Sequence, residues 1–411
     1  MENQSVAIVL GGTYPHKSLI NKLKERDYHT ILIDFLENAP ALINSDEHIR
    51  ESTLDKEKVL EISKDKHADL VISACIDQAN VTACYVAEHM KLFSPYSFKT
   101  ALLVSNKTLM KKVLIENNIP TAKFKTFESI EAIDDLELSF PLIVKPSDSN
   151  SSKGVRKVDN SAELLNAANI AFKISRDGKF LIEEYIEGKE IGVDCVIKND
   201  DVQIIMTRER RKILSDEKDV QQIIGSYWPA DIDQHVSKKA REIAIKIKDA
   251  FGLNNTMFFM QAIVRGDEIF VIEFAPRVGG GENYKIIEML TGVDVLNVSI
   301  QSFLGEPINY TYQSPQTKCA DIYLYAYPGI LDSIVGLEEL QENKIIDSYS
   351  LFKNRNYQIT SEMASGNRLG SFIVSGETFS ELDSKIETAI SKIKILDDKN
   401  EDITKRSIYI Q

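Results

Sequence analysis

The sequence of 411 residues contains only four cysteines, and it has no long apolar run. Cys75, Cys84, Cys195 and Cys319 lie far apart, without the spacing of a metal-binding cluster. We therefore expect reduced thiols in the core and no cysteine chemistry. The first residues lack the basic charge and apolar segment of a signal peptide, and no run is long enough to span a bilayer. A cytoplasmic protein without a membrane partner is the expectation.

An excess of positive charge is also missing. The chain has 49 lysines and arginines against 62 aspartates and glutamates, so its formal net charge is −13. Such a surface repels phosphate backbones, and nucleic acid is therefore not an expected partner. The composition is 43% hydrophobic and 27% charged, which is typical of a folded protein, and the length favours two or three domains. An anionic ligand would require a locally basic pocket.

The first hundred residues alternate apolar strands with amphipathic helices. Residues 5–10, the run ILIDF at 31–35 and the run ADLVISAC at 68–75 indicate buried strands, with a helix between the first two. This order predicts a parallel α/β sheet. Gly11 and Gly12 fit either a phosphate-binding turn or a tight turn beside a helix. The tight turn is favoured, because the rest of the dinucleotide fingerprint is absent.

Two further regions follow. Residues 100–118 predict a helix, with Ser105 or Asn106 near a start. From residue 120 to about 315, short strands joined by turns such as KNDD and RGDE predict an antiparallel sheet. The runs ADIYLYAY and GSFIVSG, followed by a helix, predict a third α/β unit. The expected domains are 1–100, 101–315 with a small lid lobe at about 120–187, and 316–411.

Two segments place polar groups where a nucleotide could bind. FPLIVKP ends at Lys145 and Pro146 and leads into the loop SDSNSSKGV, whose backbone and hydroxyl donors could fold over phosphates. An ordinary edge-strand charge beside a surface hairpin is the alternative. In FLIEEYIEGKEIGVD, glutamates lie among apolar residues, which a solvated strand face would also explain.

A pair of oxygen-bearing side chains is predicted near the end of the central region. Gln261 and Glu273 lie on two strands that turn at residues 265–267, and their offset places both side chains on one face. Mg²⁺ accepts such ligands while keeping part of its water shell. A buried ion pair of Glu273 with Arg277 is the alternative. The glycines at 279–281 precede a helix and favour a carboxylate or phosphate pocket over a flexible loop.

The order and spacing of these segments resemble the ATP-grasp superfamily over most of the chain. In that family an early lysine precedes a central lysine, a phosphate loop, an acidic hinge and a metal-binding strand pair ending in E-x-N-x-R. The carboxy-terminal run NRLGSFIVSGETFSELDSKIETAI resembles the closing domain of the biotin carboxylase, carbamoyl phosphate synthetase and glycinamide ribonucleotide synthetase-like branch. The resemblance implies an α/β protein with an α+β central part, in which an ATP-grasp domain lies between a Rossmann-like N-terminal domain and a biotin carboxylase-like C-terminal domain.

Carried over residue by residue, the resemblance implies an ATP site. Lys107 and Lys145 match the two lysines that contact phosphates, and Glu190 matches the glutamate that accepts the ribose hydroxyls. Two further sets of residues match the phosphate loop and the adenine hinge of the family. They are Ser149, Ser151, Ser152 and Gly154 for the loop, and Glu183, Glu184, Tyr185 and Ile186 for the hinge. The phosphate loop has less glycine here than is usual in the family.

The same resemblance implies a metal site. Gln261 and Glu273 match the ligands of Mg²⁺, with Mn²⁺ as an alternative ion, and Arg277 matches the cation that holds the acceptor substrate. Ala275 stands where the family has asparagine, so one oxygen ligand is missing. The resemblance therefore leaves open whether the site binds one metal ion or two.

The basic run TRERRK at 207–212 is either a solvated strand end or a source of charge for the reaction. Beside a triphosphate, Arg208, Arg210 or Arg211 could stabilise the transferred phosphoryl group, and Arg210 is taken as the catalytic candidate together with Lys145 and Arg277.

The implied activity is ATP-dependent ligation of a small carboxylate to an amine, through an acylphosphate, with release of ADP and phosphate. A glycinamide ribonucleotide synthetase or a biotin carboxylase-type enzyme is the nearest alternative, although the chain has no Met-Lys-Met sequence for attached biotin. A nucleotide-binding protein that has lost catalysis is the alternative outside the enzymes, and Ala275 motivates it. The expected partners are small molecules and, by the same resemblance, a second copy of the chain in a homodimer.

Overall fold

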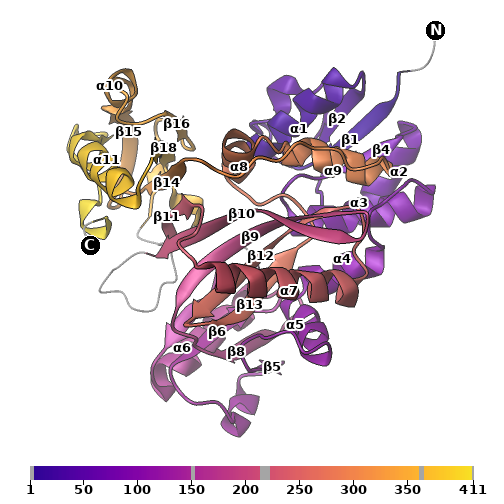
Figure 1. Ribbon diagram of the computed structural model, residues 1–411, viewed down its shortest axis with the longest axis horizontal. Coiled ribbons are helices and arrows are strands. Elements are labelled where there is room, and N and C mark those ends of the chain that lie inside the picture. Colours follow the sequence, from indigo (N-terminus) through magenta and orange to yellow (C-terminus); the bar gives the residue numbers. More distant parts are fainter. Residues whose placement is uncertain (1–3, 150–152, 213–222, 361–364, 410–411) are drawn as a thin grey trace.

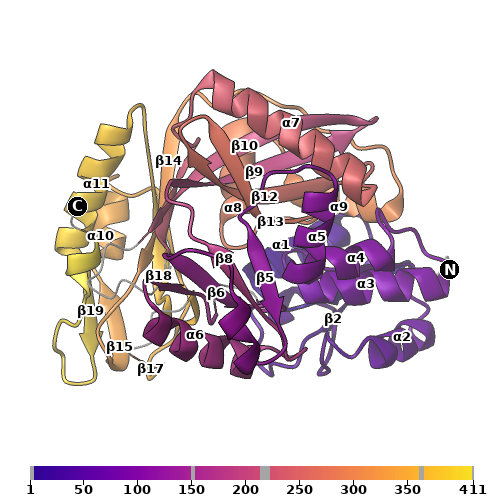
Figure 2. The same cartoon turned by 90° about the horizontal axis from the view of Figure 1, so that it is seen from below.

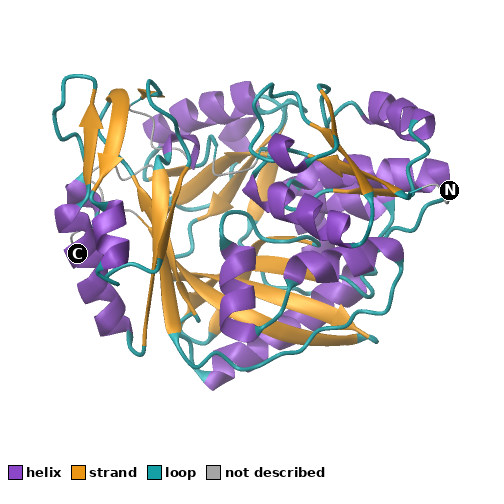
Figure 3. Ribbon diagram, turned by 90° about the horizontal axis from the view of Figure 1, so that it is seen from above, coloured by secondary structure: helices purple, strands orange, loops and turns teal. Residues whose placement is uncertain are grey.

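The computed structural model describes residues 4–149, 153–212, 223–360 and 365–409. Figure 1 shows an N-terminal unit and a C-terminal unit on opposite sides of a long central sheet, with a small lobe extending from the central part. Figure 3 shows the strands of this sheet running between the helices of the two outer units. The four parts are described in chain order, because each contributes residues to one region between them.

The N-terminal unit is the predicted parallel α/β sheet. It comprises β1 (Val6–Leu10), α1 (Tyr14–Glu25), β2 (His29–Ile33), η1 (Leu42–Asn44), β3 (Glu47–Ile49), α2 (Lys56–Asp65), β4 (Leu70–Ile72) and α3 (Asp77–Met90). The strand order is β3-β2-β1-β4, and all pairings are parallel. Residues 7–10 are fully buried, as expected of a strand covered on both faces. Gly11 has a φ of 101°, in agreement with a tight turn before α1.

Two helices replace the single helix predicted over residues 100–118. They are α4 (Phe98–Ser105) and α5 (Lys107–Glu116). Asn106 separates them because its backbone is extended and its side-chain oxygen accepts a hydrogen bond from the amide of Leu109, which makes it the N-cap of α5. Lys107 is therefore the first residue of a helix.

The small lobe is an antiparallel sheet with the order β5-β8-β6-β7. Its elements are β5 (Phe124–Phe127), η2 (Glu131–Asp135), β6 (Leu142–Pro146), β7 (Arg156–Val158), α6 (Ser161–Ile174) and β8 (Phe180–Glu184). Leu142 and Val144 pack into the core that α6 closes. Because side chains alternate along a strand, Lys145 lies on the opposite face of β6.

The central sheet has eight strands in the order β13-β12-β9-β10-β11-β14-β18-β16, and the predicted antiparallel pairing is confirmed. Its first part contains β9 (Lys189–Lys198), β10 (Asp201–Lys212), β11 (Ile223–Trp228), α7 (Gln234–Phe251), β12 (Met257–Arg265), β13 (Glu268–Ala275), α8 (Asn283–Thr291) and α9 (Val295–Leu304). Helix α7 packs along one face, as Figure 2 shows. On the other face α8 contacts β10, and α9 contacts β12 and α1, which joins the sheet to the N-terminal unit.

The C-terminal unit contains β14 (Lys318–Leu324), β15 (Gly329–Val335), α10 (Leu337–Glu342), β16 (Ser348–Leu351), β17 (Gln358–Ile359), η3 (Ser365–Asn367), β18 (Gly370–Gly376), α11 (Phe379–Lys392), β19 (Lys394–Asp397) and η4 (Arg406–Ile408). Strand β14 pairs with β11, so the central sheet continues across the limit predicted at residue 315. Strands β15, β17 and β19 form a separate small sheet. The domain limits stay predictions.

Composition predicted free thiols and no membrane span. All four cysteines are free, and Cys84, Cys195 and Cys319 are buried as expected. Among the described helices none is long and apolar enough to cross a membrane alone. Only α8 and α9 taken together reach that length and composition, and the pair is bent by 104°.

Candidate active site

One face of the central sheet carries the polar residues that the sequence indicated. The strand register places Arg208 opposite Gly192, Gly192 opposite Gln261, and Gln261 opposite Glu273. These positions form one row across β10, β9, β12 and β13, and side chains in such a row share a face. The common face predicted for Gln261 and Glu273 is confirmed.

A second row lies beside the first. Arg210 is opposite Ser226 on β11, and Ser226 is opposite Asp321 on β14. Arg210 follows Arg208 by two residues and therefore shares its face. Arg211 has the opposite orientation: its Nε lies 3.0 Å from Glu209 Oε1, and its guanidinium lies 4.5 Å from the centre of the Tyr227 ring. Of the three arginines considered, Arg208 and Arg210 point toward the site.

Two adjoining cavities open along this face. We call the first the lysine pocket, lined among others by Lys107, Lys145, Glu183, Tyr185, Ile186 and Glu190. We call the second the arginine cavity, lined among others by Asp77, Arg208, Arg277, Gly281, Tyr323 and Arg368. A common wall belongs to both: Lys107, Ser149, Arg210, Ile223, Gln261 and Glu273. The two cavities therefore adjoin along these shared residues.

The lysine pocket contains a buried charge triad. Glu183 Oε1 lies 2.6 Å from Lys145 Nζ and 3.5 Å from Lys111 Nζ, and all three side chains are almost completely buried. Burial would raise the pKa of Glu183, but the charges of Lys111 and Lys145 lower it overall. Burial also lowers the pKa of Lys111 to about 8. One ionised carboxylate thus pairs with Lys145 of the small lobe and with Lys111 of α5.

Lys107 connects the lobe to the central sheet. Its Nζ lies 3.4 Å from Glu273 Oε2 and donates a hydrogen bond to the backbone carbonyl of Ser149. Burial would raise the pKa of Glu273, but Lys107, Lys145 and Arg210 lower it. Glu273 is therefore ionised and faces the common wall.

The other residues predicted for the nucleotide surround the same pocket. Glu190 lies 2.9 Å from an Nη of Arg210 and 3.4 Å from Lys212 Nζ. The amide of Tyr185 donates to the carbonyl of Pro141 at 3.1 Å. Glu184, Tyr185 and Ile186 line the lysine pocket, and Ser149 lines both cavities. Gly154 lies outside both linings, and Ser151 and Ser152 lie outside the described residues.

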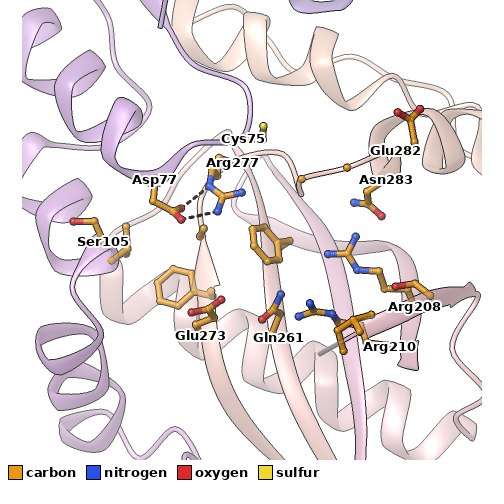
Figure 4. Close-up of a pocket in the computed structure, with 18 of the residues that line it drawn as sticks. Cys75, Asp77, Ser105, Arg208, Arg210, Gln261, Glu273, Arg277, Glu282 and Asn283 are labelled. Atoms are coloured by element: carbon orange, nitrogen blue, oxygen red, sulfur yellow. Dashed lines mark hydrogen bonds and ion pairs between the residues drawn. The ribbon is translucent and has the colours of Figure 1, made fainter. Parts of the chain in front are cut away.

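Arg277 has a partner that the sequence analysis did not find. Its Nε and one Nη lie 2.5 and 2.6 Å from the two carboxylate oxygens of Asp77, as Figure 4 shows. The predicted alternative, an ion pair of Arg277 with Glu273, is wrong, since Glu273 pairs with Lys107. Asp77 is the first residue of α3, shortly after β4. The sequence could have indicated Asp77 as a site residue, because ligand-binding residues of parallel sheets lie at the carboxyl ends of the strands.

The C-terminal unit supplies two more residues that sequence reasoning missed. Tyr323 and Arg368 line the arginine cavity, and the Arg368 guanidinium lies 3.7 Å from the centre of the Tyr323 ring. Nε of Arg368 also donates to the Tyr325 hydroxyl at 3.0 Å. No local motif connects residues 323 and 368, so only the pairing of β14 with β18 reveals their proximity.

The common wall can be tested for its fit to a divalent cation. Gln261 and Glu273 present an amide and an ionised carboxylate side by side (Figure 4), and such oxygen donors suit Mg²⁺. Among the described residues no group of three or more His, Cys, Asp and Glu side chains could hold a metal. Ala275 is buried opposite Phe259 and adds no oxygen. The pair fits a cation that takes its remaining ligands from phosphates and water.

Comparison with known proteins agrees with this arrangement. Residues 138–285 match the model of the ATP-grasp domain. The formate-dependent phosphoribosylglycinamide formyltransferase of Prochlorococcus marinus is 26% identical over 316 residues, which are 73% of this chain and 76% of that protein. The matched range 138–285 includes strands β6 to β8 of the small lobe, Gln261 and Glu273 of the common wall, and Arg277.

Two solved structures show the same fold over almost the whole chain. The L-amino acid ligase from Bacillus licheniformis superposes with a TM-score of 0.81 at 18% identity and covers 97% of this chain and 100% of that one. The phosphoribosylglycinamide synthetase from Anaerococcus prevotii gives 0.75 at 21% identity, with 96% and 100% covered.

The fold and the family match define the class. The chain has the ATP-grasp fold, with a Rossmann-like unit before it and a biotin carboxylase-like unit after it. Residues 138–285 match an ATP-grasp domain, the relatives of the chain are ATP-grasp enzymes, and the chain is therefore an enzyme.

Proposed function

We propose that this protein joins a small carboxylate to an amine at the expense of ATP, through an acylphosphate. The common wall between the two cavities carries this proposal. Lys107, Gln261 and Glu273 border both, so a phosphate in the lysine pocket and a carboxylate in the arginine cavity would meet there. That proximity is the requirement for direct phosphoryl transfer between bound substrates.

The lysine pocket would bind ATP. Lys145 and Lys107 would contact the phosphates, and the backbone at Tyr185 and Ile186 would contact the adenine edge. Glu190 would accept the ribose hydroxyls. The ion pairs of the pocket support these roles, because Glu183 and Glu190 hold Lys145 and Arg210 in place. Little rearrangement is then needed when the triphosphate enters.

Gln261 and Glu273 would hold Mg²⁺ at the common wall. When bound, the ion would neutralise phosphate charge and orient the terminal phosphoryl group. Lys107 would share Glu273 with the ion, since its ammonium lies 3.4 Å from that carboxylate. Arg210, on the same wall, is the side chain we assign to the charge of the transferred phosphoryl group.

The reaction balances without a protein nucleophile. A carboxylate oxygen attacks the terminal phosphorus of ATP, the bond to ADP breaks, and an acylphosphate forms. The neutral amine then attacks the carbonyl carbon and expels phosphate. The substrate ammonium loses one proton to solvent, and the second leaves with the phosphate. The small lobe would exclude water while the acylphosphate exists.

The test is ADP release by the full-length protein with Mg·ATP. Each standard L-amino acid, formate, acetate and bicarbonate is supplied as the carboxylate, first with hydroxylamine and then with each amino acid as the amine. A pair that stimulates ADP release and yields hydroxamate or amide supports the proposal. ADP release that no carboxylate stimulates would rule it out. A homodimer stays a prediction, and sedimentation of the same sample tests it.

A further inference from the structure

Helix α5 carries two lysines one turn apart, and their surroundings differ. Lys107 lines both cavities, whereas Lys111 lies outside both linings and its side chain is completely buried. Residues four apart on a helix share a face, so both lysines lie on the side of α5 that faces the lysine pocket. Lys111 is therefore behind the wall of that pocket, where it cannot contact a ligand directly.

The ammonium of Lys111 is fixed by the chain that leads into the small lobe. Its Nζ donates to Thr121 Oγ1 at 2.6 Å and to the carbonyl of Ala122 at 3.4 Å. Thr121 Oγ1 in turn donates to the carbonyl of Val271 at 2.7 Å, and the amide of Val271 donates to the carbonyl of Pro120. The entry to the lobe is thus tied to β13 of the central sheet, and Lys111 is held at this crossing.

Glu183 lies between this fixed ammonium and one that faces the pocket. Its Oε1 is 3.5 Å from Lys111 Nζ and 2.6 Å from Lys145 Nζ. Lys145 lines the lysine pocket, so a phosphate that enters competes with Glu183 for that ammonium. If Lys145 were the only counter-ion, its movement toward a phosphate would leave a buried carboxylate unpaired, which is unfavourable. Lys111 prevents this, because its own ammonium stays in place.

The charges of the triad do not cancel. Two lysines face one carboxylate, so the triad as a whole carries one positive charge. Burial lowers the pKa of Lys111 to about 8, while Glu183 opposes the shift and Lys145 adds to it. The Lys111 ammonium is therefore mainly charged at neutral pH, and the Phe124 ring, whose centre is 5.3 Å from Nζ, also favours the cation. The excess positive charge is available to a phosphate in the pocket.

We propose that Lys111 is a positioning residue for nucleotide binding: it neutralises Glu183 and thereby frees the Lys145 ammonium for a phosphate of ATP. This inference rests on the proposed function, since that function assigns the phosphates to the lysine pocket. Two consequences follow from the arrangement. Lys111 matters for ATP but not for adenosine, which has no phosphate, and it is needed only while residue 183 carries a negative charge.

Direct binding tests this role without turnover. Full-length protein with magnesium is titrated calorimetrically with a non-hydrolysable ATP analogue and, separately, with adenosine. In Lys111→Met the Kd of the ATP analogue should rise by about tenfold or more, and that of adenosine by less than about twofold. Lys112→Met is the control, since Lys112 is the next residue of α5, is exposed, and its loss changes the net charge equally. Equal losses for both ligands, or an unchanged affinity for the ATP analogue, would overturn the inference.

A double variant separates this role from a purely structural one. Lys111→Met combined with Glu183→Gln removes the carboxylate together with its fixed counter-ion. The affinity for the ATP analogue should then return to within about threefold of the wild type. No recovery relative to Lys111→Met alone would mean that Lys111 acts through packing, and would also overturn the inference.

Thr121→Val supplies the same contrast if Lys111→Met does not fold. It keeps the charge of Lys111 but removes the hydroxyl that accepts from Nζ at 2.6 Å. The Kd of the ATP analogue should rise by about threefold, with no change for adenosine, and an unchanged Kd for both would contradict the inference. The ligase assay is independent of these titrations. A wild type that binds the ATP analogue but shows no carboxylate-dependent ADP release would refute the proposed function alone, whereas a wild type that does not bind the analogue would refute both.

Discussion

The lysine pocket and the arginine cavity share a wall but balance their charges differently. In the lysine pocket, Glu183 lies between Lys111 and Lys145, and Glu190 is paired with Arg210. In the arginine cavity, Arg208 and Arg368 have no carboxylate partner among the described residues. One pocket is organised before any ligand enters, whereas the other keeps cations that a ligand would neutralise. This difference suits a pocket that always binds the same nucleotide beside a cavity that must select one substrate from others.

The two regions also differ in how the chain builds them. The lysine pocket uses segments between residues 107 and 273, most of them on neighbouring strands. The arginine cavity combines α3, β10, the glycine turn at 279–281, β14 and Arg368, which lies two residues before β18. Changes in each region should therefore have different consequences, and the variants below test that difference.

The largest effect is expected at the wall that both regions share. Glu273→Gln removes the carboxylate proposed to hold Mg²⁺ and leaves Lys107 without its partner. We expect carboxylate-dependent ADP formation to fall by about 10³-fold. Steady-state rates at saturating magnesium check this. Glu268→Gln is the control, since Glu268 is exposed on the same strand and pairs with Arg265. A Glu273 variant within about tenfold of wild type would contradict the metal assignment.

The next effect concerns stability and separates two adjacent glutamates of the lysine pocket. Glu183→Ala leaves two buried lysines facing each other, and we expect the free energy of unfolding to fall by about 3 kcal/mol. Glu184→Ala removes an acid that is partly exposed and pairs with Lys123 at 3.4 Å, so the loss should stay below about 1 kcal/mol. Urea unfolding of both variants measures the difference. Equal losses would mean that the triad does not organise the lobe.

A smaller effect is expected from crowding the arginine cavity. Gly192→Ala places a methyl group where Arg208 lies, 2.6 Å from Nε, and so should displace that guanidinium. The KM for an acid-bearing amine should rise about fivefold, with little change for hydroxylamine. Gly366→Ala is the control, because no atom of the described residues beyond its chain neighbours lies within 4 Å of the added carbon. Unchanged KM values in Gly192→Ala would mean that the position of Arg208 does not matter.

The smallest effect is a pH dependence confined to the arginine cavity. Burial raises the pKa of Asp321 to about 7, and Glu282 adds to the rise, while Ser371, Arg368 and Lys285 oppose it. Below that pH the carboxyl is neutral. Above it, a negative charge lies beside Arg368 and weakens anion binding. We expect the KM of an acid-bearing amine to rise by roughly fivefold as pH increases through about 7. In Asp321→Asn this part of the profile should be flat, and a persistent rise would assign it to another group.

The residues that line the lysine pocket were predicted from local signals together with the resemblance to the ATP-grasp family. Lys145 ends an apolar strand, Glu183 and Glu190 follow each other within one segment, and Gln261 and Glu273 flank a two-residue turn. Strand alternation and turn geometry are enough to place such residues on a face. The parallel first sheet and the antiparallel central sheet follow from the same periodicity.

The arginine cavity could not be predicted in the same way. The pairing of Asp77 with Arg277 joins residues 200 positions apart, and Arg368 reaches the site only because β18 pairs with β14. Long-range pairing depends on the packing of whole sheets, which no local pattern encodes. The domain limit predicted at residue 315 has the same origin. Composition does not show that β14, which follows this limit, pairs with β11 and continues the central sheet.

The central claim is that a carboxylate oxygen attacks the terminal phosphate of ATP. The most direct measurement uses the carboxylate found in the ADP-release screen, labelled with ¹⁸O in both oxygens, and mass spectrometry of the released phosphate. Phosphoryl transfer to the carboxylate predicts one ¹⁸O atom in the phosphate for each ADP formed. Unlabelled phosphate, with ADP still formed, would mean that water takes the phosphoryl group and would contradict the account.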